Sequence, residues 1–394
     1  MADLQGITIL DLTLNAPGQA ACSALADMGA SVIAVTRPGY AAARGFNGAW
    51  SVGRNKRSIT LNLQDPRARE VFDKLARASD VIVEGFRPGV VNRLGVGYEA
   101  IRKIQPKIIY CSLSGYGQDG PYRDFPGHDI NYQAIAGMVP LDKKGRPFLP
   151  TTNWADRQAS TNLEVAILLA LVVRERHGVG QYADVSYADA STTIPADESF
   201  KDPKIDRILP GGPPGSESPP SKNLQGIYPA YNMYQCQDGK YISLGIIESW
   251  FWEKLCVYFG KPEWTRYQTD EGKMRARVRA FLRRKFKEKP RDVWFRILSQ
   301  EVGTQVAPVN IGYEVMDDPH MRARESVIQV ETPGGGKMWQ VGFPYKLSVT
   351  KGKVWRAATV AGQDTVAILK DLGYGAADIE TFRRENVVEV AEGF

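Results

Sequence analysis

The stretch GITILDLTLNAPGQAACSALADMGASVIAVTR (residues 6–37) carries two kinds of hydrophobic pattern. Residues 6–13 and 31–37 are apolar and rich in β-branched side chains, as buried strands are. Residues 18–30 between them place apolar side chains at helical spacing. A strand, a helix and a second strand in this order predict two parallel strands joined by a helix.

The same alternation continues to residue 117. We expect a helix over 65–79, a strand over 80–86, a short helix near 98–104 and a strand over 107–117. This repetition predicts an α/β domain of Rossmann type, in which ligands bind beyond the carboxyl ends of the strands. The first strand is not followed by G-x-G-x-x-G, and the second ends in Arg37 rather than in an acid, so we reject a nicotinamide cofactor.

The rest of the chain predicts a second domain. A long helix over 156–176 and a strand with the start of a helix over 180–192 complete a large domain over 1–200. Residues 201–225 are rich in Pro, Gly and Ser, which is typical of a linker or a lid. A hairpin around an Asp-Gly turn and several helices follow, so we expect a small α+β domain over 226–325.

The composition is that of a globular protein long enough for two domains, with 394 residues of which 43% are hydrophobic. Four cysteines lie far apart without a C-x-x-C pair, so we expect neither a metal site nor a disulfide framework. No basic leader precedes the first apolar run, and the longest apolar run, at 165–173, is too short to span a bilayer. We therefore expect a cytoplasmic protein with no membrane partner.

Two segments concentrate basic residues. Residues 273–289 hold nine basic residues against one acid, but Val278, Leu282 and Phe286 recur at helical spacing. We interpret this segment as an amphipathic helix with a solvated basic face, and we expect no nucleic-acid partner. Residues 37–64 hold five basic residues and no acid directly after a strand. This second stretch fits a phosphate-binding loop or a plain surface loop equally well.

His128, one of only three histidines, precedes a short helical run that Asp129 can cap. The positive end of a helix disfavours the imidazolium, so the ring would stay neutral as a general base requires. A hydrogen-bonded structural histidine explains the same pattern.

Two carboxylates are further candidates. Asp156 precedes the long helix, where it acts either as a plain N-cap or beside amides that hold a developing oxyanion. Glu248 lies between an apolar strand and an aromatic helix and needs a partner there. His128, Asp156 and Glu248 are far apart in sequence, so only the fold can bring them together.

The ordered blocks of the chain resemble the family III CoA-transferase superfamily (CaiB/BaiF type), and within it they are most similar to the α-methylacyl-CoA racemases. The resemblance covers nearly the whole chain. It is carried by GITILDLT, NKRSITLNL, VEGFRPGVVNRLGVGYE, YCSLSGYGQDGPYRD, PGHDINYQAIAG, GQYADVSYADA, YQCQDGKYISLGIIE and EVMDDPH.

The resemblance implies an interlocked homodimer whose large domain contains both chain ends, so that 326–394 return to it. It also implies a racemase or epimerase that inverts C2 of a 2-methyl or 2-substituted acyl-CoA thioester through an enolate. His128 and Asp156 would be the two bases, and Glu248 of the partner chain would support the histidine. CoA enters as part of the substrate, and no separate cofactor is implied.

The resemblance further implies that basic side chains grip the CoA phosphates. The candidates are Arg37, Arg54, Lys56, Arg57 and Arg87.

One departure concerns the residues after the second base. Many racemases have glycines after this aspartate, whereas Arg157 and Gln158 follow Asp156 here. The resemblance therefore implies a tighter or more polar pocket, or one arranged around a different acyl group.

Two other functions remain open at this point. A CoA-transferase would use Asp156 as a covalent nucleophile and pass CoA between carboxylic acids. A CoA-binding protein without catalysis would be indifferent to Asp156→Asn. The racemase alone needs His128 and Glu248 in addition to Asp156, which is why it leads.

Overall fold

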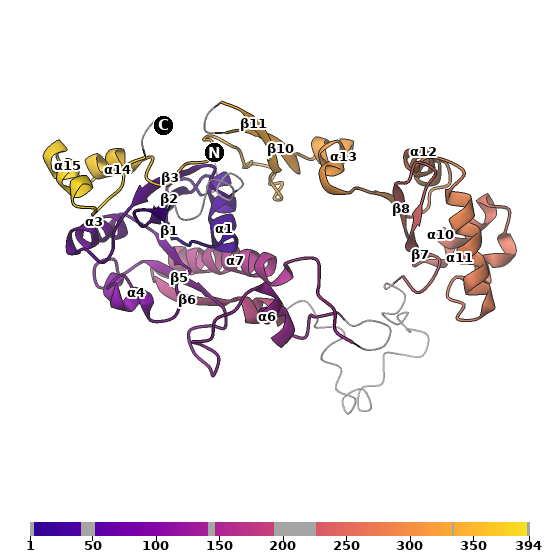
Figure 1. Cartoon of the computed structure of the whole chain (residues 1–394), viewed down its shortest axis with the longest axis horizontal. Helices are drawn as coiled ribbons and strands as arrows, with labels where there is room; N and C mark the ends of the chain where they lie inside the picture. Colours follow the sequence, from indigo (N-terminus) through magenta and orange to yellow (C-terminus); the bar gives the residue numbers. More distant parts are fainter. Residues whose placement is uncertain (1–3, 41–51, 141–145, 193–225, 333–334, 392–394) are drawn as a thin grey trace. The chain divides into compact units, whose positions relative to one another are not determined.

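The computed structural model describes residues 4–40, 52–140, 146–192, 226–332 and 335–391 (Figure 1). The chain divides into two compact units. The large unit comprises residues 1–200 and 322–394, and the small unit comprises residues 201–321. The expected linker or lid over 201–225 lies outside the described residues.

A parallel sheet of six strands forms the centre of the large unit, in the order β3-β2-β1-β4-β5-β6. This is the order of a doubly wound Rossmann sheet, and it confirms the α/β prediction. The direction of the connections reverses between β1 and β4, which is where ligands bind in such sheets. The strands are β1 (Thr8–Leu12), β2 (Ser31–Thr36), β3 (Lys56–Thr60), β4 (Val81–Glu84), β5 (Ile109–Ser114) and β6 (Gln181–Ser186).

Helices cover both faces of this sheet because successive strand residues point to opposite sides. In β1, Ile9 packs into a core with α1 (Ala16–Asp27) and α7 (Trp154–His177). The next residue, Leu10, packs into a second core with α3 (Pro66–Arg77). The short helices α4 (Val90–Arg93) and α5 (Tyr98–Ile101) contribute to this second core.

The predicted long helix is confirmed as α7, which ends at Gly178 in the left-handed conformation (φ 70°). That conformation is easily adopted by glycine alone, so the helix ends there. Among the described helices, none combines the length and the apolar character needed to cross a membrane.

The basic stretch at 37–64 is not a loop throughout, because Lys56 and Arg57 belong to β3. Lys56 pairs with Asp11 of β1 (Nζ–Oδ2 2.9 Å), and both side chains are almost fully buried. This is a correction to the loop that the composition suggested. Residues 41–51 of the stretch lie outside the described residues.

The C-terminal part of the large unit is held by Asn55, which is fully buried and has a positive φ of 60°. Its Oδ1 accepts the N–H groups of Trp355 and Arg356, and its Nδ2 donates to the carbonyl of Lys353. This part contains β10 (Val327–Glu331), β11 (Lys337–Val341), α14 (Thr365–Asp371) and α15 (Ala376–Arg384).

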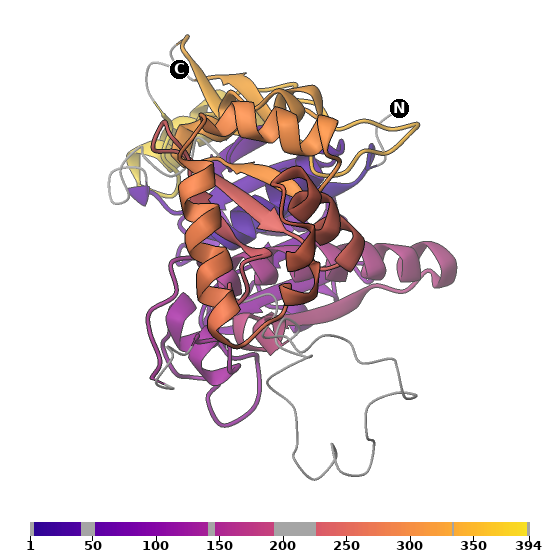
Figure 2. The ribbon, with the colours of Figure 1, turned by 90° about the vertical axis from the view of Figure 1, so that its right-hand side faces the viewer.

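An antiparallel sheet of three strands, in the order β7-β8-β9, supports the small unit, whose helices face the viewer in Figure 2. The predicted hairpin is present, with Gly239 in its turn at φ 80°. The elements are β7 (Tyr231–Gln235), β8 (Tyr241–Gly245), α10 (Ser249–Tyr258), α11 (Lys273–Phe286), α12 (Arg291–Arg296) and β9 (Val306–Val309).

The basic segment is confirmed as the amphipathic helix α11. Val278, Leu282 and Phe286 are buried, and most of the basic side chains on the helix are exposed or half-buried.

Candidate active site

His128 stands immediately before α6 (Asp129–Ile135), at the helix N-terminus as predicted. Its backbone N–H donates to Oδ1 of Asn131 (2.9 Å), which fixes the first turn. The side chain of His128 is exposed, so it is accessible to a substrate. Asp129 is the first residue of the helix rather than its cap, which corrects the sequence expectation.

Asp129 instead caps a different helix. Its Oδ1 accepts the backbone N–H of Asp156 (3.0 Å), in the first turn of α7. Its Oδ2 accepts the side-chain amide of Gln133, which also donates to the carbonyl of Thr152 (3.0 Å). The residue at the N-cap position of α7 is Asn153, so Asp156 is the third helical residue and not the predicted cap. Asp129 therefore ties the starts of α6 and α7 together.

The side chain of Asp156 is half-buried, and its charge is affected by several neighbours. Burial raises the pKa of Asp156, and the negative charge of Asp129 raises it further. The charges of His128 and Arg157 lower the pKa of Asp156, but the net shift is upward. His128 and Asp156 therefore lie within electrostatic reach of each other. A raised pKa brings a carboxyl group closer to the range that proton transfer near neutral pH requires.

Two tyrosines, Tyr132 and Tyr187, lie within electrostatic reach of Asp156, and sequence reasoning missed them. Tyr132 of α6 stacks on Tyr187, the first residue of α8 (Tyr187–Thr192), with ring centroids 5.0 Å apart. Tyr116 meets Tyr132 edge-on at 5.2 Å. Burial raises the pKa of Tyr132 to about 12, and the charges of Tyr116 and Asp156 add to the shift. Burial also raises the pKa of Tyr187. The hydroxyls of Tyr132 and Tyr187 therefore stay protonated and can donate hydrogen bonds.

A signal for this cluster was present in the sequence. Tyr132 ends the GHDINY block, and a Cβ on Gly115 would lie 2.8 Å from its hydroxyl oxygen. The glycine is needed because the ring approaches the backbone closely.

Glu248 lies in the small unit, where it occupies the N-cap position of α10. The partner that the sequence called for is Gln305, whose Nε2 donates to the Glu248 carboxylate (2.9 Å). Gln305 also accepts the N–H of Ile247 (3.4 Å), so the glutamate is held at the end of β8. The role of Glu248 beside the histidine of a partner chain stays a prediction.

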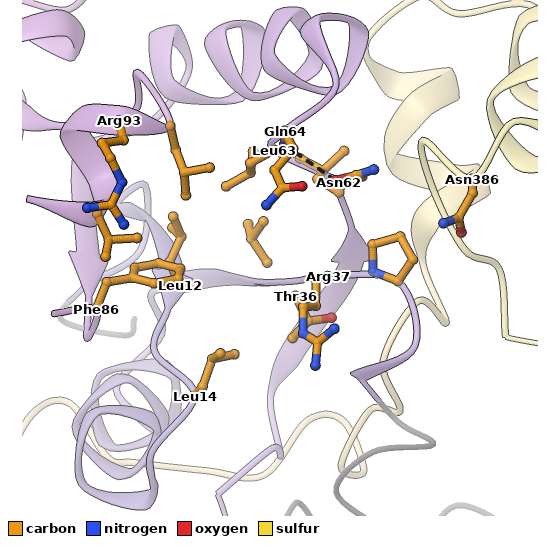
Figure 3. A pocket seen from close by; sticks show the side chains of 15 residues that line it. Leu12, Leu14, Thr36, Arg37, Asn62, Leu63, Gln64, Phe86, Arg93 and Asn386 are labelled. Carbon is orange, nitrogen blue, oxygen red and sulfur yellow. Dashed lines mark hydrogen bonds between the residues drawn. The ribbon is translucent and has the colours of Figure 1, made fainter.

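A cavity of about 440 Å³ lies at the carboxyl ends of β1, β2, β3 and β4 (Figure 3). This is where the sheet order reverses, as expected for a ligand site in this architecture. Leucine side chains and Phe86 give it apolar walls, and Arg37 and Arg93 supply positive charge. Arg93 was not among the sequence candidates, although it lies in the matching block VEGFRPGVVNRLG.

The other predicted phosphate-binding residues lie in different surroundings. Arg87 is exposed in the loop after β4. Arg57 pairs with Asp371 (2.8 Å) at the surface. Arg54 and Lys56 are buried in ion pairs, so their charges already have internal partners. Among the described residues, no group of three or more His, Cys, Asp or Glu side chains could hold a metal ion.

Comparisons with known proteins agree with this architecture. A family model described as CoA-transferase family III matches residues 4–365. The chain is 31% identical to alpha-methylacyl-CoA racemase from Homo sapiens, over 98% of this chain and 97% of that protein. It is 29% identical to formyl-CoA:oxalate CoA-transferase from Escherichia coli O81 (strain ED1a), over 98% of this chain and 99% of that protein.

A solved structure agrees with these relatives. The crystal structure of a CaiB/BaiF family protein from Brucella suis matches with a TM-score of 0.76 at 26% identity. The match covers 94% of this chain and 99% of that one. The comparisons agree on CoA-transferase family III, and they do not distinguish a racemase from a CoA-transferase.

Changing Asp129 to Asn tests the electrostatic part of this description. We expect Asp129→Asn to lower the pKa of Asp156, because the Asp129 charge raises it. Carboxyl ¹³C NMR titration measures the shift. Asp129→Ala also removes the acceptor for the helix, and we expect a loss of about 1 kcal/mol in the free energy of unfolding.

The matched control is Asp124→Asn, because Asp124 is an exposed aspartate paired with Arg123. It should leave the pKa of Asp156 where it is. An Asp156 pKa that stays constant or rises in Asp129→Asn would show that Asp129 does not act on it.

Proposed function

Because this chain belongs to CoA-transferase family III, we propose that it is an acyl-CoA racemase or epimerase. Its substrate is a 2-methyl-branched or otherwise 2-substituted acyl-CoA thioester, inverted at C2. The observation that carries the proposal is the electrostatic proximity of His128 and Asp156, at helix starts that the bond from the Asp156 N–H to Asp129 ties together. A transferase needs only the aspartate, whereas inversion needs a base on each face of the carbon.

The reaction proceeds through two proton transfers. One group removes the proton from C2, and the electrons of that bond move into the thioester carbonyl to form an enolate. The other group delivers a proton to the opposite face, and the enolate electrons return to form the new C–H bond. His128 serves one face and Asp156 the other, and each is left in the protonation state that the reverse reaction needs. The raised pKa of Asp156 favours this exchange of roles.

The enolate oxygen needs hydrogen-bond donors as its charge develops. The Asp156 N–H is already donated to Asp129, so it is occupied. The N–H of Ala155, in the same turn, has no acceptor among the residues that the structure describes. Ala155 is fully buried, however, so its N–H does not reach a bound substrate, and we assign the enolate oxygen to no residue of this turn.

CoA occupies the cavity beyond β1 to β4. Its apolar walls suit the adenine ring, and guanidinium groups bind phosphate oxygens in a bidentate manner. We assign the phosphates to Arg37, Arg87 and Arg93. Arg54 and Lys56 are left out because moving either would leave a buried carboxylate unpaired, and Arg57 is secondary because Asp371 holds it.

A CoA-transferase is the second candidate. The similarity to formyl-CoA:oxalate CoA-transferase spans the same length of chain at nearly the same identity. In this chemistry the Asp156 carboxylate attacks the thioester, and CoA leaves as the thiolate while an acyl anhydride forms. Arg157 and Gln158, which replace the glycines of many racemases, keep this candidate open.

We also propose that the protein is a homodimer. Four apolar side chains on one stripe of α7 are between 41% and 62% exposed, namely Val165, Leu168, Leu169 and Val172. An apolar stripe of this kind on a helix that is otherwise packed is typical of a subunit interface.

Light scattering coupled to size exclusion tests the dimer. We expect twice the chain mass for the wild type and the mass of one chain for Leu169→Glu combined with Val172→Glu, because the charges cannot be buried without partners. A wild type with the mass of one chain would contradict the proposal.

Mass spectrometry of an (S)-2-methylacyl-CoA incubated in D₂O, with and without succinate, separates the two activities. The racemase gains deuterium at C2 and forms the R epimer whether or not succinate is present. Succinyl-CoA formed without any exchange at C2 would overturn the racemase and support the transferase.

A further inference from the structure

A second cavity, of about 210 Å³, lies in the large unit on the other side of α4. Val90 and Arg93 of this helix line the first cavity, whereas Val91 and Asn92 line the second. The second cavity also reaches Tyr110, which packs in the core on the α3 side of the sheet, away from α7. It is therefore separate both from the candidate bases and from the proposed CoA cavity.

Three tyrosine rings form one wall of this second cavity. Tyr98, Tyr110 and Tyr182 come from α5, β5 and β6, and their centroids lie between 5.4 and 6.1 Å apart. Tyr110 and Tyr182 are stacked at 24°. The Tyr110 hydroxyl already donates to the carbonyl of Val96 (3.0 Å). Tyr110 is fully buried, so Tyr98 and Tyr182 present the aromatic surface of this wall, which favours a flat ring packed against it.

Gln118 supplies the polar group of the cavity. Its backbone N–H donates to Asp184 (2.8 Å), and its carbonyl accepts from Nε of Arg123 (2.8 Å), so its backbone is fixed. Its side-chain Nε2 is buried and has no hydrogen-bond partner among the described residues. A buried donor without an acceptor is costly, so this position calls for an acceptor from outside the chain.

The charge of the lining excludes an ionic ligand. Among the described residues that line the cavity, Glu99 is the charged one, and it pairs with Arg102 (2.9 Å). Ser112 donates its hydroxyl to the buried carboxylate of Glu84. The lining thus has no unpaired charge to offer, whereas its unpaired group is a neutral amide.

We propose that this cavity binds a small neutral ring compound that carries one hydrogen-bond acceptor. The ring lies against the tyrosine wall, and a carbonyl or hydroxyl oxygen accepts from Gln118. The volume of the second cavity is sufficient for such a ring, because a cavity of about 150 Å³ can hold benzene. The second cavity is larger, at about 210 Å³. The inference does not depend on which reaction the protein catalyses.

Ligand-observed saturation-transfer NMR with benzamide, a flat neutral amide, tests the site on the full chain. For a probe of this size we expect a dissociation constant of about 1 mM. Gln118→Leu should weaken binding by about five- to tenfold, because one hydrogen bond is lost. The matched control is Gln64→Leu, the same change in the first cavity, and it should leave binding unchanged.

Two results would overturn the proposal. One is no saturation transfer to benzamide at about 10 mM, well above the expected dissociation constant, which would mean that water satisfies Gln118. The other is binding that survives Gln118→Leu and is lost in Gln64→Leu, which would put the probe in the first cavity. If Gln118→Leu does not fold, Tyr182→Ala replaces it with the same expected loss, since Tyr182 is 37% exposed and tolerates truncation.

Discussion

The large unit depends on the buried carboxylate of Asp27, at the end of α1. It accepts hydrogen bonds from Arg54 (2.6 Å) and Asn55 (2.8 Å), and Arg54 continues to the side chain of Gln340 (2.9 Å). Burial raises the pKa of Asp27, and the Arg54 guanidinium opposes that shift. Removing one partner of such a pair costs about 3–5 kcal/mol, because it leaves an unpaired buried charge. Through these contacts the C-terminal segment is joined to the start of β3, and β3 is the edge strand of the sheet.

In the candidate site, as at Asp27, a carboxylate joins segments that are distant in sequence. One carboxylate, Asp129, joins the first turns of two helices. His128 immediately precedes α6, and Asp156 lies in the first turn of α7. The bases are thereby held by backbone and packing rather than by flexible loops, as two-sided proton transfer requires. Burial makes the largest contribution to the raised pKa of Asp156, and the charge of Asp129 adds to it.

The sequence predicted the elements whose patterns are local. The apolar runs of β1, β2, β4 and β5 and the periodicity of α7 were sufficient, because burial on both faces leaves a continuous signal. The strand β3 was not predicted, because its sequence, KRSIT, is polar. The Lys56 charge in it is neutralised by Asp11, which is distant in sequence. The capping of α7 by Asp129 was not predicted either, because 27 residues separate the donor and the acceptor in sequence. The contact of Glu248 with the histidine of a partner chain, the homodimer and the cytoplasmic location stay predictions.

The most direct test of the two-base account follows exchange at each face separately. The R and S epimers of a 2-methylacyl-CoA are incubated in D₂O with His128→Ala and with Asp156→Asn, and deuterium at C2 is measured at early times. The account predicts that neither variant interconverts the epimers, and that each exchanges the proton of one epimer only, the two variants choosing opposite epimers. If His128→Ala exchanges and interconverts both epimers as the wild type does, histidine is not one of the bases and the account fails.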